Sequence, residues 1–258
     1  MSDFIIFTIG SSDYALEVAS VDRIDQIPKL TPTPNAHPFV DGHMTYQDHT
    51  LKVLNFRKMT DVQAHEEQML GLFNQVIKDH QNWVAALEVS LREGVPFKLA
   101  LDPHLCRLGK WIYSYTAHDP EVLRIIRALI PVHAQLHERG AELLRLPKDD
   151  KEVALQRYTS EIINGIYVET MGLLGEMVRK SAEVSAHTQK ILIYRANDGL
   201  FAIKVDAIRD IIAIDDSQIK SYSHQVKVGA CLQTRGVVEY KKSLVVVIDS
   251  VMLPQGDA

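Results

Sequence analysis

The chain contains 258 residues with 28 Lys and Arg against 33 Asp and Glu, a formal net charge of −5. At roughly 150 residues per domain, this length predicts one large domain or two small ones. The charges are interspersed and form no basic block, which disfavours a protein that tracks nucleic-acid phosphates. Uninterrupted apolar runs reach five residues, as from Leu244 to Ile248, whereas a membrane helix needs roughly 18 or more. We therefore expect no nucleic-acid partner and no membrane insertion.

The N-terminus and the cysteines bear on the compartment. The first ten residues include the acidic Asp3 and no cationic segment, and their apolar stretch from Phe4 to Ile9 is shorter than that of a signal peptide. The two cysteines, Cys106 and Cys231, lie far apart and form no disulfide framework. We expect a cytoplasmic protein in which Cys231 is a small buried apolar residue.

An internal repeat relates the two ends of the chain. Each copy contains two alternating apolar runs joined by turn residues, the pattern of a β-hairpin, followed by a further strand. The repeat predicts two short-stranded β units, both small barrels. The matching segments are Phe4 to Phe7 with Ile191 to Tyr194, Tyr14 to Val18 with Phe201 to Val205, and Thr50 to Leu54 with Ser243 to Val247.

Residues 62–188 have helical periodicity instead. Apolar residues recur at three- and four-residue steps, which predicts four helices: 63–92, 103–113, one that begins at 119–120 and runs to about 144, and 149–186. Pro131 predicts a kink or a helix restart, and Gly165 predicts a bend. We expect an antiparallel four-helix bundle inserted in a loop of the β domain, because such a bundle brings its two ends together.

Four potential metal ligands lie on these helices: His80, Cys106, His133 and His137. The three histidines fall on the buried apolar stripes, where an unpartnered imidazole is costly. Histidines four residues apart on one helical face converge on one ion, and a thiolate with imidazoles suits tetrahedral zinc. Each histidine alone is more often a hydrogen-bonded core residue, but the four together favour a zinc site.

The residues around these ligands form three blocks in a fixed order. His80 is followed by Trp83, Cys106 by Leu108, Gly109 and Trp111, and His133 by His137. The blocks resemble the signature of the chemoreceptor zinc-binding (CZB) domain, a helical bundle whose His, Cys, His and His bind zinc. The resemblance implies that these four residues ligate zinc and that the other positions support the motif.

The flanking segments are similar to the chemotaxis coupling protein CheW, which is built from two small β-barrels and links chemoreceptors to the histidine kinase CheA. The residues that carry this likeness are Tyr14-Ala15-Leu16, Val21, Val40-Asp41-Gly42, Leu51 to Phe56, Val205-Asp206, Val228-Gly229-Ala230 and Leu244 to Asp249. The chain departs from the family where Thr45-Tyr46-Gln47-Asp48 replaces the usual Asn-Leu-Arg-Gly. Gln47 stands where the family has an Arg implicated in receptor contact, so a receptor docks through a different surface or not at all.

An enzymatic interpretation starts from the zinc. A gluzincin needs a glutamate as general base after its first histidine, but Ala134-Gln135-Leu136 separates His133 from His137. If Cys106 is the fourth protein ligand, no position is open for an activated water. Phosphate-binding, hydrolase-elbow and deaminase motifs are also missing from the sequence. We expect no catalysis, with a zinc-dependent hydrolase as the alternative.

Together the two resemblances imply an α+β protein with a CheW-like β domain in two halves, residues 1–61 and 189–258, and an inserted CZB-like bundle, residues 62–188. They imply a chemotaxis scaffold that couples chemoreceptors to a CheA-type histidine kinase. Zinc or an oxidant such as hypochlorous acid would be sensed through Cys106, the oxidisable ligand. A purely structural zinc in a diverged adaptor remains the other interpretation, and a homodimer through the bundle is left open.

Overall fold

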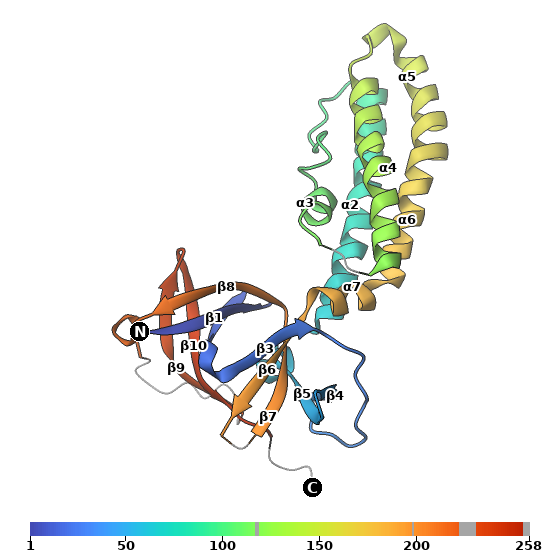
Figure 1. Ribbon diagram of the computed structural model, residues 1–258. Helices are drawn as coiled ribbons and strands as arrows, with labels where there is room; N and C mark the ends of the chain where they lie inside the picture. The colour runs from blue at the N-terminus through green and yellow to red at the C-terminus, as the bar shows by residue number, and fades with distance from the viewer. Residues whose placement is uncertain (117–118, 198, 222–230, 255–258) are drawn as a thin grey trace. The chain divides into compact units, whose positions relative to one another are not determined.

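The structure is a computed structural model that describes residues 1–116, 119–197, 199–221 and 231–254 (Figure 1). The chain divides into two compact units. The β unit comprises Met1–His65 and Ala186–Ala258, and the helical unit comprises Glu66–Ser185. The fold is therefore α+β, as predicted. No helix in the described ranges is long and apolar enough to cross a membrane.

The β unit contains two five-stranded sheets in the part of the chain that is described. A short helix, α1 (Phe56–Met59), follows the fifth strand. The strands are β1 (Ser2–Ile9), β2 (Ser12–Glu17), β3 (Val21–Gln26), β4 (Val40–Tyr46), β5 (His49–Asn55), β6 (Lys190–Ala196), β7 (Gly199–Val205), β8 (Ala207–Ile214), β9 (Leu232–Tyr240) and β10 (Ser243–Val251). Single turns of 3₁₀ helix occur at η1 (Val18–Ser20) and η4 (Asp216–Gln218).

Both predicted hairpins form, since β1 pairs antiparallel with β2 and β6 pairs antiparallel with β7. The sheets, however, do not follow the two copies of the repeat. Their strand orders are β8-β1-β2-β10-β9 and β3-β6-β7-β5-β4, so each sheet takes strands from both halves of the chain. The two predicted β units are therefore present as two sheets, each of which combines strands from both copies. The two sheets have the same strand order when each strand is replaced by its counterpart in the other copy of the repeat. Closure of the sheets into barrels remains a prediction.

The interlaced sheets bury three apolar cores. One core collects side chains from both sheets, among them Phe7 and Leu16 from the first and Leu192 and Phe201 from the second. Each sheet also encloses a core of its own, around Phe4 in the first sheet and around Val53, Ile191 and Ala202 in the second. Central strands such as β1 are consequently buried on both faces, which accounts for their continuous apolar sequence.

Within the described residues, the helices between the two parts of the β unit are three long segments, the two short helices α3 and α7, and the 3₁₀ turn η2 (Figure 1). The third long segment is continuous but changes geometry, because the π-helical stretch η3 joins two α-helices and contains Gly165, the predicted site of irregularity. The elements are α2 (His65–Glu93), α3 (Arg107–Ile112), α4 (Pro120–Leu144), η2 (Lys148–Asp150), α5 (Lys151–Arg157), η3 (Tyr158–Ile166), α6 (Tyr167–Arg179) and α7 (Ser181–Thr188).

The helix α4 excludes one of the two outcomes expected at Pro131. Pro131 lies inside the helix, which runs from Pro120 to Leu144 without a restart. Proline removes one backbone hydrogen bond, but the apolar side chains on both sides of it remain on one buried face. Packing of that face therefore outweighs the lost hydrogen bond. The buried residues of α4 are Val122, Ile125, Ile126, Leu129, His133, Leu136, His137, Gly140 and Leu143.

Candidate metal centre

The structure brings the four predicted ligands together inside the helical unit. His80 comes from α2, Cys106 precedes α3, and His133 and His137 are one turn apart on α4. One ligand atom from each residue lies within 4.8 Å of the others. The three histidines are at most 3% exposed, whereas Cys106 is only partly buried. The burial that helical periodicity predicted for the three histidines is therefore confirmed.

The imidazole rings are oriented by backbone carbonyls. The Nδ1 of His80 donates to the Val76 carbonyl at 2.8 Å, and the Nδ1 of His137 donates to the Ala100 carbonyl at 3.1 Å. The Nε2 atoms of both rings are buried without a hydrogen-bond partner. A ring that donates through one nitrogen keeps a lone pair on the other, the arrangement typical of metal-bound histidine.

The third histidine faces the sulfur. The Nε2 of His133 lies 3.3 Å from the Sγ of Cys106, and its Nδ1 is buried without a partner. Three buried imidazole nitrogens thus lack partners, which costs free energy unless something binds them. A zinc ion suits this donor set of three imidazoles and one thiolate. The residues present therefore fit the metal that their sequence motif implies.

Cys106 is held at the start of α3. It is the N-cap residue, and its Sγ accepts a hydrogen bond from the backbone N–H of Gly109 at 3.3 Å. A Cβ at position 109 would lie 1.8 Å from the carbonyl oxygen of Pro103. Only glycine permits this approach between the helix and the preceding loop. The Cys-x-x-Gly spacing is therefore explained by the geometry that positions the sulfur.

The remaining motif residues pack around the cluster. Trp83 donates from Nε1 to the Ala100 carbonyl at 2.8 Å, and its ring centroid lies 4.9 Å from that of His137. Leu108 is fully buried, and Trp111 packs edge-on against Phe73 at 5.0 Å between centroids. Ala100, which accepts from both His137 and Trp83, was not predicted from the sequence, because it lies in a loop without periodicity.

Burial controls the ionisation of the cluster. It lowers the pKa of His133 to about 3 and of His137 to about 4, with the neighbouring imidazoles acting in the same direction. Burial also lowers the pKa of His80, against the hydrogen bond to Val76. All three rings are therefore neutral near pH 7, as metal ligation requires. Burial raises the pKa of the Cys106 thiol, so a metal cation is what favours its thiolate.

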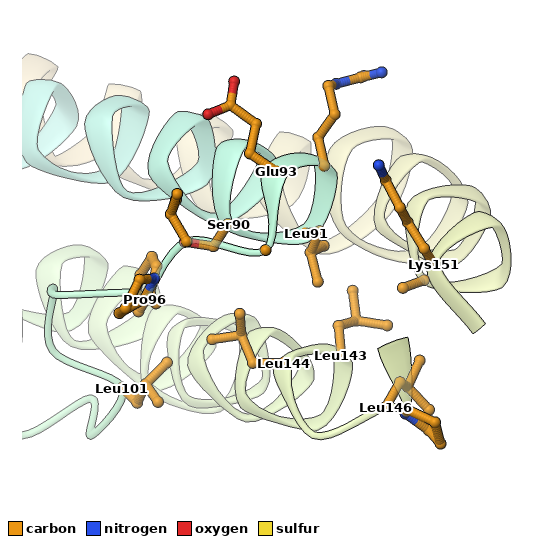
Figure 2. A pocket seen from close by; sticks show the side chains of 15 residues that line it. Ser90, Leu91, Glu93, Pro96, Leu101, Leu143, Leu144, Leu146 and Lys151 are labelled. Atoms are coloured by element: carbon orange, nitrogen blue, oxygen red, sulfur yellow. The ribbon is translucent and has the colours of Figure 1, made fainter. Parts of the chain in front are cut away.

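A separate cavity of about 580 Å³ lies in the helical unit between the C-terminal ends of α2 and α4 (Figure 2). Leucine side chains, including Leu91, Leu143 and Leu144, point toward it, and Lys151 lies at its margin. It shares no residue with the histidine and cysteine cluster. The sequence had not indicated this cavity, since its lining comes from helix ends and the loop between them.

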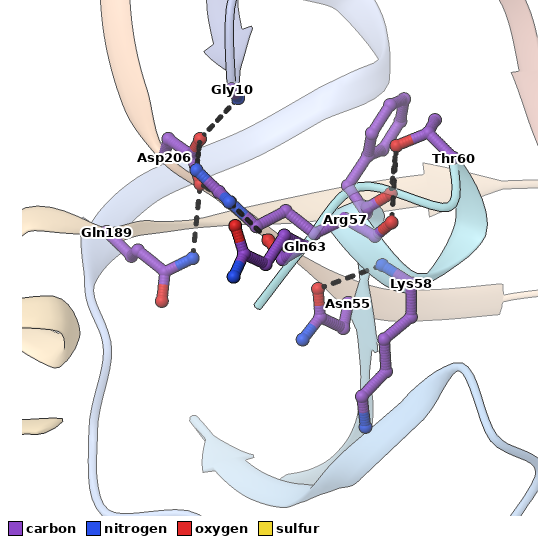
Figure 3. A network of polar contacts seen from close by, with 9 residues as sticks. Gly10, Asn55, Arg57, Lys58, Thr60, Gln63, Gln189 and Asp206 are labelled. Atoms are coloured by element: carbon purple, nitrogen blue, oxygen red, sulfur yellow. Dashed lines mark hydrogen bonds and ion pairs between the residues drawn. The ribbon is translucent and has the colours of Figure 1, made fainter. Parts of the chain in front are cut away.

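A buried ion pair lies in the β unit, and one of its partners, Asp206, is among the residues that carry the CheW likeness in the sequence (Figure 3). Arg57 binds Asp206 through two contacts, Nε to Oδ1 at 2.7 Å and Nη2 to Oδ2 at 2.6 Å. The Gly10 amide donates to the same carboxylate at 2.7 Å and the Gln189 side chain at 3.2 Å. Arg57 also donates to the Gln63 carbonyl. The pair therefore joins the two chain segments that lead into and out of the helical unit.

Other sequence expectations fall elsewhere in the β unit. Gln47 is exposed at the turn between β4 and β5, where its backbone φ is 51°. Cys231 is 4% exposed and belongs to the core shared by the two sheets, as expected of a small apolar residue. The segment Val228-Gly229-Ala230, which carries part of the CheW likeness, lies outside the described residues.

Comparison with known proteins identifies two family matches. Residues 3–92 match the CheW-like domain, and residues 80–144, which contain all four candidate ligands, match the chemoreceptor zinc-binding domain. Among solved structures, that of the scaffolding protein TtCheW from Thermoanaerobacter tengcongensis is similar, with a TM-score of 0.45, 9% identity, and coverage of 96% of this chain and 88% of that chain. No curated protein gives a match. Residues 3–92 are therefore similar to the CheW-like domain and residues 80–144 to the chemoreceptor zinc-binding domain, the two families that the sequence motifs resemble.

Proposed function

We propose that the protein is a non-enzymatic chemotaxis scaffold that couples chemoreceptors to a CheA-type histidine kinase and senses zinc or an oxidant through its helical unit. The observation that carries the proposal is the cluster of His80, Cys106, His133 and His137, with ligand atoms within 4.8 Å of one another. The cluster lies in the segment that matches a zinc-binding domain, in a chain that also matches a coupling domain.

Cys106 is the residue through which an oxidant would act. Zinc bound by the cluster would hold the sulfur as a thiolate, which is the reactive form. Hypochlorous acid would then transfer its oxygen: the sulfur loses two electrons and becomes a sulfenic acid, and the chlorine leaves as chloride. The three imidazoles are not readily oxidised, so they keep their lone pairs while one ligand of the four weakens.

A hydrolase is less well supported by the same residues. Four protein donors fill a tetrahedral shell and leave no position for an activated water. The residues between His133 and His137 supply no carboxylate as general base. We therefore propose a sensing or structural role for the metal.

Zinc content tests the site. We expect one zinc per chain in protein expressed without added metal, and a large loss of zinc in the His133→Ala, His137→Ala double variant. A structural zinc site contributes roughly 10 to 16 kcal/mol of binding free energy, and removing two of four ligands removes a large share of it. The matched control is His104→Ala, a histidine of the same unit that is exposed and paired with Asp102. Unchanged zinc in the double variant would contradict the proposal.

Affinity purification of the full chain from its native cells tests the coupling role. Recovery of a CheA-type kinase or a chemoreceptor is the expected result. A protein that carries zinc but recovers neither would instead be a diverged adaptor with another partner, in which the zinc is structural. A homodimer through the helical unit would be detected in the same preparation by light scattering.

A further inference from the structure

A pocket of about 250 Å³ lies directly against the candidate metal centre. Its lining includes three of the four candidate ligands, and His133 is the one that it lacks. The other lining residues come from α2, from the loop before α3, and from α3 itself. The full lining is Asp79, His80, Asn82, Trp83, Leu99, Ala100, Cys106, Arg107 and His137.

Burial shows which side of the cluster is open. His133 is 0% exposed and does not reach the pocket, so the cluster is closed on that side. Cys106 lines the pocket and is the only partly exposed residue among the four ligands. A molecule that enters the pocket therefore meets the sulfur before it meets the deeper imidazole.

The rim of the pocket is fixed by polar contacts. The Nε of Arg107 lies 2.8 Å from the Oδ2 of Asp79, which joins α3 to α2, and Gln75 donates to the other carboxylate oxygen at 2.8 Å. Trp83 and His137, which also line the pocket, both donate to the carbonyl of Ala100. These contacts join the lining residues of α2, α3, α4 and the loop before α3 to one another.

We propose that this pocket is the route by which small molecules reach Cys106, and that its size selects which of them do so. The inference rests on the proposed function, since it concerns access to the same cluster. A water molecule occupies roughly 30 Å³ of liquid, so 250 Å³ accommodates reagents of a few heavy atoms, such as hypochlorous acid. Under this proposal, larger thiol reagents and folded redox proteins react with Cys106 more slowly than small ones.

A pocket-filling substitution tests the route. Leu99→Trp adds bulk at an exposed lining residue that ligates nothing, and Asn82→Trp does the same from α2 if the first variant does not fold. The control is Val89→Trp, which adds the same side chain to an exposed position of α2 outside the pocket. Folding is checked by circular dichroism and zinc content by elemental analysis before any reaction.

The readout is the rate at which Cys106 is alkylated in the folded protein with its zinc content as verified, followed by peptide mass spectrometry. Iodoacetamide is the small probe, from which the thiolate displaces iodide, and fluorescein maleimide is the bulky one. We expect iodoacetamide to react at least about tenfold more slowly in Leu99→Trp, because thiol reactivity follows access. Val89→Trp should react within about twofold of the unaltered protein, and fluorescein maleimide should leave Cys106 of the unaltered protein largely unmodified.

Two outcomes separate this inference from the function on which it rests. Absence of zinc from the unaltered protein would overturn the proposed metal site, while the alkylation rates would still report on access to Cys106. Full zinc content together with a wild-type alkylation rate in the folded Leu99→Trp and Asn82→Trp variants would overturn the access route alone. Rapid labelling by fluorescein maleimide would overturn the selection by size.

Discussion

Arg57 and Asp206 form an ion pair in the interior of the β unit, and each charge compensates the other. The guanidinium is 3% exposed and meets the carboxylate through two parallel contacts, with further donors from Gly10 and Gln189. Buried charges of this kind are tolerated when paired, and removal of one leaves the other desolvated without compensation. The pair therefore makes the fold of the β unit sensitive to either residue.

The substitution Arg57→Met tests this dependence. We expect the β unit to lose roughly 3 to 5 kcal/mol of stability, because Asp206 is left buried without its cation. The double variant Arg57→Met, Asp206→Leu should lose less than the sum of the two single variants. Urea denaturation followed by circular dichroism measures the effect, and tryptophan fluorescence is the internal control, since both tryptophans lie in the helical unit. An unchanged midpoint for Arg57→Met would contradict the assignment.

We expect the stability of the β unit to depend on pH through His65. Burial lowers its pKa to about 4, with Arg57 and Lys204 acting in the same direction and Asp206 against them. Between pH 6.5 and pH 4 the unfolded chain binds a proton at this residue that the folded chain does not, so stability falls as the pH falls through this range. In His65→Gln this contribution is absent, and the loss of stability between pH 7 and pH 5 should be smaller. Equal losses in both proteins would exclude His65 as the cause.

At the scale of single elements, the loop before α3 and the glycine within that helix determine where the sulfur lies. Gly109 is needed because its Cα approaches the Pro103 carbonyl, and the same residue donates its amide to Cys106. By contrast, a Cβ added to Gly172 in α6 meets nothing within 4 Å. The two helical glycines therefore provide a matched pair, one required by packing and one not.

We expect Gly109→Ala to displace α3 and weaken zinc binding by at least about tenfold, since residues that orient a ligand typically contribute 10- to 100-fold to metal affinity. Gly172→Ala should leave zinc binding unchanged. It should stabilise α6 by up to about 1 kcal/mol, because Gly172 is an exposed position inside this helix. Competition with a zinc chelator measures the affinity, and thermal unfolding measures the stability. Equal zinc affinity in the two variants would show that the approach to Pro103 does not position Cys106.

The elements differ in how far their sequence predicts them. Helical periodicity located α2 and α4 and the buried face of each, and strand alternation located both hairpins, because these patterns depend on neighbours in sequence. The position of Cys106 as an N-cap and the role of the Ala100 carbonyl were not predicted, since loops carry no such period. The strand exchange was also missed, because the parallel pairs β2 with β10 and β5 with β7 join residues far apart in the chain.

At the scale of the whole molecule, the exchange of strands means that neither half of the β unit has a complete sheet. The first sheet combines β1 and β2 with β8, β9 and β10, and the second combines β6 and β7 with β3, β4 and β5. Both chain segments that connect to the helical unit contact one ion pair, through the Gln63 carbonyl and the Gln189 side chain. The β unit can therefore be interrupted at this point without separating its strands.

Fragments test the exchange. We expect residues 1–61 alone to be unfolded, because their strands lack the partners supplied by the second half. Residues 1–65 joined by a short flexible linker to residues 186–258 should regain the strand signal in circular dichroism and unfold cooperatively. Dispersed amide resonances from residues 1–61 alone would contradict the interlaced arrangement.

Under the proposed function, zinc or an oxidant at the site in the helical unit would alter the interactions of the β unit. The most direct measurement is the affinity of the zinc-loaded full chain for a CheA-type kinase, before and after treatment with sub-stoichiometric hypochlorous acid, with Cys106→Ala as the control. We expect sulfenic acid at Cys106, weaker zinc binding and a changed kinase affinity, with the oxidant having no effect on the affinity of Cys106→Ala. Oxidation of Cys106 with an unchanged kinase affinity, or oxidation of methionines while Cys106 stays reduced, would contradict this expectation.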